Sequence, residues 1–164
     1  MTELNVTTLK EVPLLKELTT FELQKMLEKG TTLTTPAHAN ILIEGELSWG
    51  LYIILDGLVG VFKVNKLKNT THDVAQLKKG NFFGEMSLIE DAPRSASIKA
   101  LTECNLFYLS KDAFNSLLNQ SDDMKMRFYE SCIKLLVSRL RELNENYTLS
   151  QFQIWQKALT KEVA

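Results

Sequence analysis

Glycine and proline are unevenly distributed along this chain of 164 residues. All seven glycines lie between positions 30 and 84, and no glycine or proline follows Pro93. Glycine marks tight turns and bulges, whereas a long stretch without glycine or proline favours helix. The distribution therefore predicts a strand-rich middle and a helix-rich C-terminal part.

Composition predicts a folded domain with a real core, because 45% of the residues are hydrophobic. A net charge of −1 argues against a general nucleic-acid binder and against a polybasic membrane-surface protein. No apolar run approaches the length that spans a bilayer, and the N-terminus lacks the features of a signal peptide. Two isolated cysteines, Cys104 and Cys132, are expected to be reduced thiols in a cytoplasmic protein.

Short runs rich in β-branched and aromatic residues predict strands at 41–43, 51–55, 58–64, 74–77, 97–101 and 105–109. Asp56-Gly57 lies between two of these runs and predicts a hairpin. Helices are predicted after Thr19, whose spacing to Glu22 fits a capping box, and from Ser110 to Leu118. The first of these helices is expected to end at Gly30.

Residues 122–161 read as one long helix with a seam of apolar residues three and four apart, formed by Ile133, Leu136, Leu140, Leu143, Tyr147 and Ile154. Such a helix would reach roughly 60 Å, too far to bury its seam on one small domain. The seam therefore predicts a homodimer through this helix. The alternative is a helix broken near residues 144–150 that folds back on its own domain.

The most informative stretch is GNFFGEMSLIEDAPRSA at positions 80–96. Gly84 permits an unusual dihedral or a close backbone approach, residues 85–89 can form one helical turn, and Pro93 prevents its continuation. The start of such a turn offers unpaired amide groups to an anion such as phosphate. This stretch is thus a candidate anion-binding loop.

The side chains around that turn extend this chemistry. Arg94 carries a fork of donors that matches phosphate oxygens, and Ser95 adds a hydroxyl. Ala96 is small enough to let its own amide reach a ligand. Glu85, which is repelled by phosphate, is suited to accept a hydrogen bond from a hydroxyl such as a ribose 2′-OH. Together these features describe a site for the phosphate and ribose of a nucleotide.

The stretch resembles the phosphate-binding cassette of the cyclic nucleotide-binding domain family, whose Gly-Glu and Pro-Arg-Ser/Thr-Ala elements stand here at 84–85 and 93–96. The resemblance extends through residues 44–57 and covers about residues 10–145. One departure is Leu47-Ser48-Trp49, which stands where family members often carry Pro-Gly-Asp. Trp49 is expected there to cover apolar surface or to meet a partner.

The resemblance implies an α+β fold, namely a jelly-roll-like β-roll of about eight antiparallel strands flanked by N- and C-terminal helices. It divides the chain into a nucleotide-binding part at 1–120 and a long dimerisation or output helix at 121–164. It also implies that Glu85 holds the ribose, that Arg94 holds the cyclic phosphate, and that Ser95 favours cAMP over cGMP. The implied ligand-binding residues are Gly84, Glu85, Met86, Ser87, Arg94, Ser95, Ala96 and, by rough alignment with a base-reading position, Asn144.

The predicted function is therefore a cytoplasmic cAMP receptor, with cGMP as a second possible ligand, that signals through its C-terminal helix to an unidentified effector protein. No enzyme activity, metal, cofactor, membrane partner or direct DNA binding is expected. His38 and His72 stand alone, and no helix-turn-helix follows the long helix. Two other functions stay open: a dimeric scaffold without ligand, in which Glu85 and Arg94 merely pair, and a regulator that acts on DNA through a separate chain.

Overall fold

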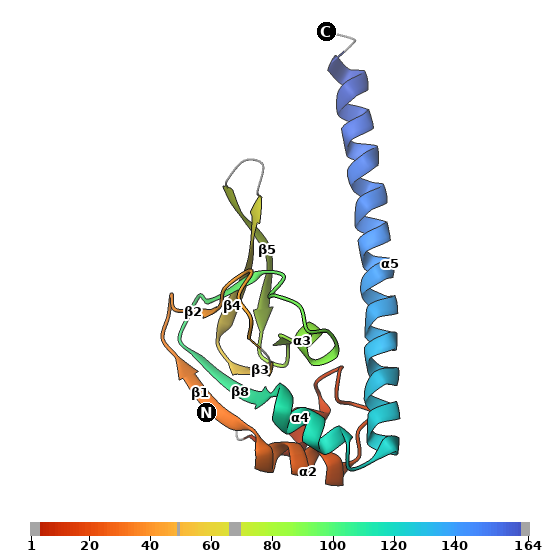
Figure 1. Cartoon of the computed structure of the whole chain (residues 1–164). Helices are drawn as coiled ribbons and strands as arrows, with labels where there is room; N and C mark the ends of the chain where they lie inside the picture. Colours follow the sequence, from red (N-terminus) through yellow and green to blue (C-terminus); the bar gives the residue numbers. More distant parts are fainter. Residues whose placement is uncertain (1–3, 49, 66–69, 162–164) are drawn as a thin grey trace.

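The structure is a computed structural model that describes residues 4–48, 50–65 and 70–161. Trp49 and the side chain of Ile154 lie outside the described part, and so does the role expected of Trp49. Figure 1 shows a β-roll with short helices at its lower end and one long helix standing beside it.

Two short helices open the chain. Helix α1 (Val6–Lys10), which the sequence did not predict, is capped by the side chain of Asn5. Helix α2 (Thr20–Lys29) begins with the predicted capping box, in which Thr19 and Glu22 exchange side-chain and backbone hydrogen bonds. It ends at Gly30, as predicted.

The strands form two antiparallel four-stranded sheets, and this confirms the predicted fold class. One sheet has the order β1-β8-β3-β6 and consists of Thr31–Thr35, Cys104–Ser110, Gly50–Asp56 and Phe82–Phe83. The other has the order β2-β7-β4-β5 and consists of Asn40–Leu42, Ser97–Ala100, Leu58–Asn65 and Thr70–Lys78. Strands β1 and β6 were not predicted, because β1 is threonine-rich and exposed and β6 has only two residues.

The predicted hairpin at Asp56-Gly57 is wrong. Gly57 does turn the chain with a φ of +96°, but β3 before it and β4 after it belong to different sheets. A Cβ on Gly57 would lie 2.5 Å from the carbonyl oxygen of Glu103. The dipeptide therefore carries the chain between the sheets in close contact with the β7–β8 connection, where a hairpin would have kept it within one sheet.

Two apolar cores hold the molecule together. One lies within the β-roll and includes Ile54, Val59 and Leu106. The other joins the sheet that contains β3 and β8 to the helices, and includes Phe107, Phe114 and Phe128. The rings of Phe114 in helix α4 (Lys111–Leu118) and Phe128 meet edge to face with centroids 4.6 Å apart.

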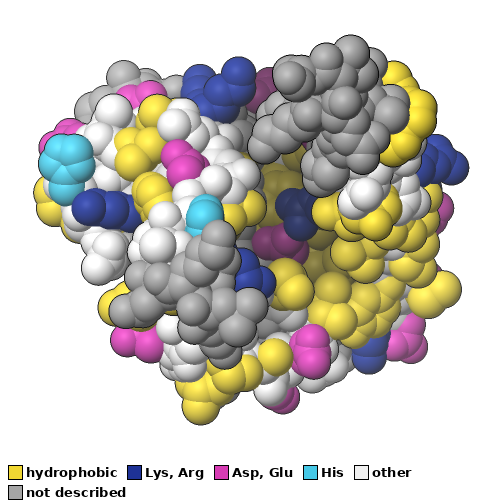
Figure 2. Space-filling view, turned by 90° about the horizontal axis from the view of Figure 1, so that it is seen from above, with side chains coloured by type: hydrophobic (Ala, Val, Ile, Leu, Met, Phe, Trp, Pro, Cys, Tyr) yellow, Lys and Arg dark blue, Asp and Glu magenta, His cyan; other side chains and the backbone are white. Residues whose placement is uncertain are grey.

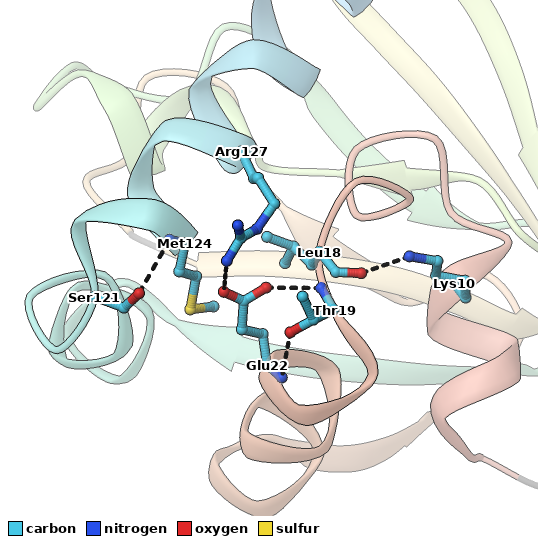
Figure 3. Close-up of polar contacts among 7 residues, drawn as sticks. All are labelled: Lys10, Leu18, Thr19, Glu22, Ser121, Met124 and Arg127. Carbon is cyan, nitrogen blue, oxygen red and sulfur yellow. Dashed lines mark hydrogen bonds and ion pairs between the residues drawn. The ribbon is translucent and has the colours of Figure 1, made fainter.

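Helix α5 (Asp122–Lys161) is anchored at its start on the N-terminal helices (Figure 3). The hydroxyl of Ser121 accepts a hydrogen bond from the amide of Met124, as an N-cap does. Arg127 forms an ion pair with Glu22, the buried carboxylate that also completes the capping box of α2. One acidic side chain thus fixes both the start of α2 and the base of α5.

Beyond its base α5 is exposed and extends past the β-roll (Figure 1). It is one continuous helix, without the break near residues 144–150 that the alternative interpretation required. The described seam residues are all exposed: Ile133, Leu136, Leu140, Leu143 and Tyr147. Among the helices described, none is both long enough and apolar enough to cross a membrane.

Candidate functional site

A cavity of about 220 Å³ opens at the predicted anion-binding loop. Apolar side chains of the sheet β2-β7-β4-β5 form one wall, among them Leu42, Val61 and Leu77. Residues 82–87, Glu90, residues 92–96 and Arg139 of α5 form the rest. Figure 2 shows a hollow on the face seen from above, with hydrophobic side chains around it and a basic and an acidic side chain inside. An apolar wall with a few polar groups is the usual make-up of a small-molecule site.

The loop enters the cavity through a glycine that no other residue could replace without strain. Gly84 has a φ of +84°, and a Cβ there would lie 2.4 Å from the carbonyl oxygen of Gly50. Helix α3 (Met86–Ile89) follows directly, so the predicted single helical turn is present. The first amides of a helix have no partner within it, and the first two residues of α3, Met86 and Ser87, line the cavity.

Arg94 is buried, with 7% of its surface exposed, and its guanidinium borders the cavity. Its Nε donates to the hydroxyl of Ser48 over 2.9 Å, and its Nη1 donates to the hydroxyl of Ser87 over 3.1 Å. The carbonyl oxygens of Gly84 and Gly50 accept at 3.2 and 3.4 Å. Within the described residues, each oxygen that accepts a hydrogen bond from this cation is neutral.

A buried cation held only by neutral oxygens is electrostatically incomplete. In the described part of the chain, no carboxylate is within salt-bridge distance of Arg94. Burial lowers the pKa of Arg94, and the nearby Tyr52, Tyr108 and Glu85 only partly oppose this. Burying a charge without a counter-charge is costly, so an anion in the cavity would be stabilised here.

The scaffold interpretation required Glu85 to pair with Arg94, but Glu85 pairs with Arg139. Its carboxylate is 2.5 Å from Nη1 of Arg139 on α5, and it forms no ion pair with Arg94. The guanidinium of Arg139 also lies over the ring of Phe82, 5.6 Å from its centroid. The loop and the long helix are therefore joined across the mouth of the cavity.

Seven of the eight predicted ligand residues lie together in the cavity lining: Gly84, Glu85, Met86, Ser87, Arg94, Ser95 and Ala96. The hydroxyl of Ser95 is 3.7 Å from the sulfur of Met86. Asn144, the eighth, does not line this cavity. It is exposed and lies further along α5. A partner helix or a different position of α5 would be needed to place it near the cavity.

Sequence reasoning missed three groups at this site. Ser48 and the side chain of Ser87 hold Arg94, and Arg139 holds Glu85. Ser48 belongs to the departure at residues 47–49, to which the sequence assigned no role at this site, and Ser87 was predicted as a ligand residue and not as a partner of Arg94. Arg139 is one of several charged residues along α5, and nothing in its spacing separates it from Arg141 or Lys134.

Comparison with known sequences identifies the family of this loop. The family model described as "Cyclic nucleotide-binding domain" matches residues 32–121. A cAMP-dependent protein kinase regulatory subunit from Neurospora crassa is 35% identical over 119 residues, which are 73% of this chain but only 30% of that protein. The match thus spans less than a third of that relative's length.

Solved structures of the same fold support the assignment. The catabolite activator protein of Thermus thermophilus matches with a TM-score of 0.72 and 28% identity, over 85% of this chain and 63% of that one. The regulatory domain of Toxoplasma gondii PKA, crystallised with cAMP, matches with a TM-score of 0.65 and 26% identity, over 76% of this chain and 48% of that one.

Proposed function

The chain belongs to the cyclic nucleotide-binding domain family, and from this premise we propose that it is a cAMP receptor whose long helix transmits the bound state to a partner protein. It acts as a binding module with no catalytic step of its own. Residues 1–120 form the nucleotide-binding part, and the long helix within residues 121–164 serves in dimerisation or output.

The observation that carries this proposal is the buried guanidinium of Arg94. It borders a cavity, has only neutral hydrogen-bond partners and lies near the amides that begin α3. A cyclic phosphate supplies the missing negative charge, and its ring form fits a loop whose amides and arginine converge. The apolar wall with Leu42, Val61 and Leu77 suits a nucleobase.

The choice of cAMP over cGMP is supported by Ser95 and by the relatives. The protein from Neurospora crassa is named for its dependence on cAMP, and the domain from Toxoplasma gondii was crystallised with cAMP. Here Ser95 lies in the cavity lining, at the position from which the family resemblance predicts a preference for cAMP.

Signalling through α5 is supported by the contact between Glu85 and Arg139. The carboxylate assigned to the ribose 2′-OH already holds the long helix. A nucleotide whose 2′-OH donates a hydrogen bond to Glu85 must therefore change the free energy of this contact. Ligand and helix position are coupled whenever the nucleotide has different affinities for the two helix arrangements.

The exposed seam of α5 supports a homodimer. Leu136, Leu140, Leu143 and Tyr147 are each more than half exposed on a helix that extends past the domain. A parallel pair of such helices, related by two-fold symmetry, would bury the same seam twice. The effector would then read the position of the paired helices.

Thermal unfolding with a panel of nucleotides tests the proposed ligand. We expect cAMP to raise the unfolding temperature at micromolar concentrations, cGMP to require more ligand, and non-cyclic 5′-AMP to have no effect, because a ligand of the folded state stabilises it by mass action. A cyclic dinucleotide serves as a size control. No shift with cAMP or cGMP at millimolar concentration would contradict the proposal and favour the scaffold interpretation.

A further inference from the structure

The three nitrogens of the Arg94 guanidinium are unequally engaged. Nε and Nη1 are held by the hydroxyls of Ser48 and Ser87, at 2.9 and 3.1 Å, and Nη1 also donates to the carbonyl of Gly84. Nη2 makes one long contact of 3.4 Å, to the carbonyl oxygen of Gly50. Nη2 can therefore still donate a hydrogen bond to a ligand, whereas Nε and Nη1 are fixed by protein groups.

The hydroxyl of Ser87 can only accept from Arg94. Ser87 is 4% exposed, and its Oγ donates its single hydrogen to the carbonyl oxygen of Gly84 at 2.9 Å. Its remaining lone pairs face Nη1 of Arg94 and the amide of Gly50, which is 3.3 Å away. The negative end of the hydroxyl dipole is therefore directed at the cation, and the serine cannot turn without losing a hydrogen bond.

Ser48 lies on a segment that also holds the backbone of Arg94. The amide of Arg94 donates to the carbonyl oxygen of Glu46 over 3.0 Å, and the amide of Gly45 donates to the carbonyl oxygen of Arg94 over 2.9 Å. The same short segment thus fixes the main chain of Arg94 and, through Ser48, its Nε. Arg94 is therefore held by one segment both at its main chain and at the guanidinium end of its side chain.

We propose that Ser48 and Ser87 are positioning residues that set the plane of the Arg94 guanidinium and leave Nη2 for an anionic oxygen of the ligand. Neutral hydroxyls can orient the guanidinium and leave its positive charge in place. A carboxylate in the same position would cancel that charge. Arginine has several rotatable bonds, so its ordering before the ligand arrives removes part of the entropic cost of binding. This inference rests on the proposed function, since the anion is the phosphate of cAMP.

Deletion of either hydroxyl tests the proposal with a matched control. In titrations with cAMP, Ser48→Ala and Ser87→Ala should each bind about tenfold more weakly than wild type, as expected when a hydrogen bond to a charged group is lost. Ser131→Ala removes a hydroxyl that is as buried as that of Ser87 and has no hydrogen-bond partner in the described part of the chain. It should bind cAMP as wild type does. Affinities of both serine variants within twofold of wild type, or an equal loss in Ser131→Ala, would overturn the proposal.

A second measurement needs no nucleotide and so separates this inference from the proposed function. In NMR spectra of the ligand-free protein, the Nε–H signal of Arg94, assigned by its loss in Arg94→Lys, should exchange slowly with solvent. It should broaden or disappear in Ser48→Ala and persist in Ser131→Ala. If wild type binds no cyclic nucleotide but shows this pattern, the positioning role stands and the proposed function fails. A rapidly exchanging Nε–H in wild type would overturn the positioning role itself.

Discussion

Arg94 is the residue at which burial and charge oppose each other most directly. Neutral oxygens around it accept its hydrogen bonds, but no carboxylate in the described part of the chain pairs with it. Glu85, whose charge tends to raise the pKa of Arg94, is held by Arg139 instead. The two charges of the loop are thereby kept apart, which leaves Arg94 for an anion and Glu85 for groups that donate hydrogen bonds.

Glu85 should discriminate between sugars. If its carboxylate accepts the ribose 2′-OH, wild type should bind cAMP more tightly than 2′-deoxy-cAMP by roughly 1–3 kcal/mol. Glu85→Gln should lose most of that difference. Competition titrations with the two nucleotides measure both affinities. Equal binding of the two by wild type would show that Glu85 has another role, such as holding α5 alone.

Among single residues, the sequence predicted those that stand close together in one short stretch of the chain. Gly84, Glu85 and Arg94 stand close together in the sequence, and the roles expected of them follow from their charge and shape. Ser48 and Arg139 could not be predicted, because they lie 46 and 45 positions from Arg94 along the chain. Only the packing of the 45–48 segment and of α5 against the loop brings them to the cavity.

The base of α5 is the element on which any movement of that helix depends. Burial tends to raise the pKa of Glu22, but hydrogen bonds from Arg127 and Thr19 outweigh it, so that its pKa is below the ordinary value of 4.5. A carboxylate with a lowered pKa in the folded state stabilises the fold above its unfolded pKa. That stability is lost as the pH falls through the folded value.

Glu22→Gln should therefore lower the free energy of unfolding at pH 7 by about 1–2 kcal/mol, from the loss of one charged pair and part of the capping box. Its stability should also fall less than that of wild type as the pH drops below 4.5. Urea unfolding at several pH values measures both effects. Glu28→Gln, on the same helix in an exposed pair with Lys25, is the control and should change little. Equal losses in the two variants would show that Glu22 does not anchor α5.

Cys132 provides a probe for the position of α5. It belongs to α5 and is buried where that helix packs on the core, and burial, together with the charge of Glu85, raises the pKa of its thiol to about 11. Little thiolate exists near neutral pH, so alkylation should be slow while α5 is docked. Arg139→Ala should increase the alkylation rate of Cys132 severalfold, and cAMP should change that rate in wild type.

Peptide mass spectrometry separates this effect from general loosening. Cys104, buried in β8, should keep its rate in Arg139→Ala, and Arg141→Ala, on the same helix, should alter neither cysteine. An unchanged rate at Cys132 in Arg139→Ala would mean that the pair with Glu85 does not hold the helix in place.

Elements with a local signal were predicted from the sequence, whereas their pairing was not. The capping signals of Thr19 and Ser110 and the glycine-free stretch gave α2, α4 and α5. The residues of β1 are polar and mostly exposed, and they form a strand because they pair with β8. The Asp56-Gly57 turn shows the same limit, because a turn signal does not say to which sheet the next strand belongs.

At the scale of the whole molecule, the exposed seam of α5 predicts assembly. Leu140→Asp would place two like charges in the apolar interface of a symmetric dimer, where no partner offsets their desolvation. The variant should be a monomer by light scattering, and its domain should stay folded, since Leu140 is exposed in the single chain. Thr148→Asp, off the seam on the same helix, should leave the dimer intact. A wild-type protein that is monomeric at tens of micromolar would refute the seam as an interface.

The central claim is that the cavity beside Arg94 binds a cyclic nucleotide, and calorimetric titration of cAMP tests it most directly. Wild type should show one site per chain, and Arg94→Ala should bind at least about thirtyfold more weakly, because a charge-assisted phosphate contact is worth roughly 2–5 kcal/mol. Arg141→Ala, which removes an exposed arginine of α5, should bind as wild type does. Absence of binding by wild type, or equal binding by Arg94→Ala, would contradict the assignment of this cavity.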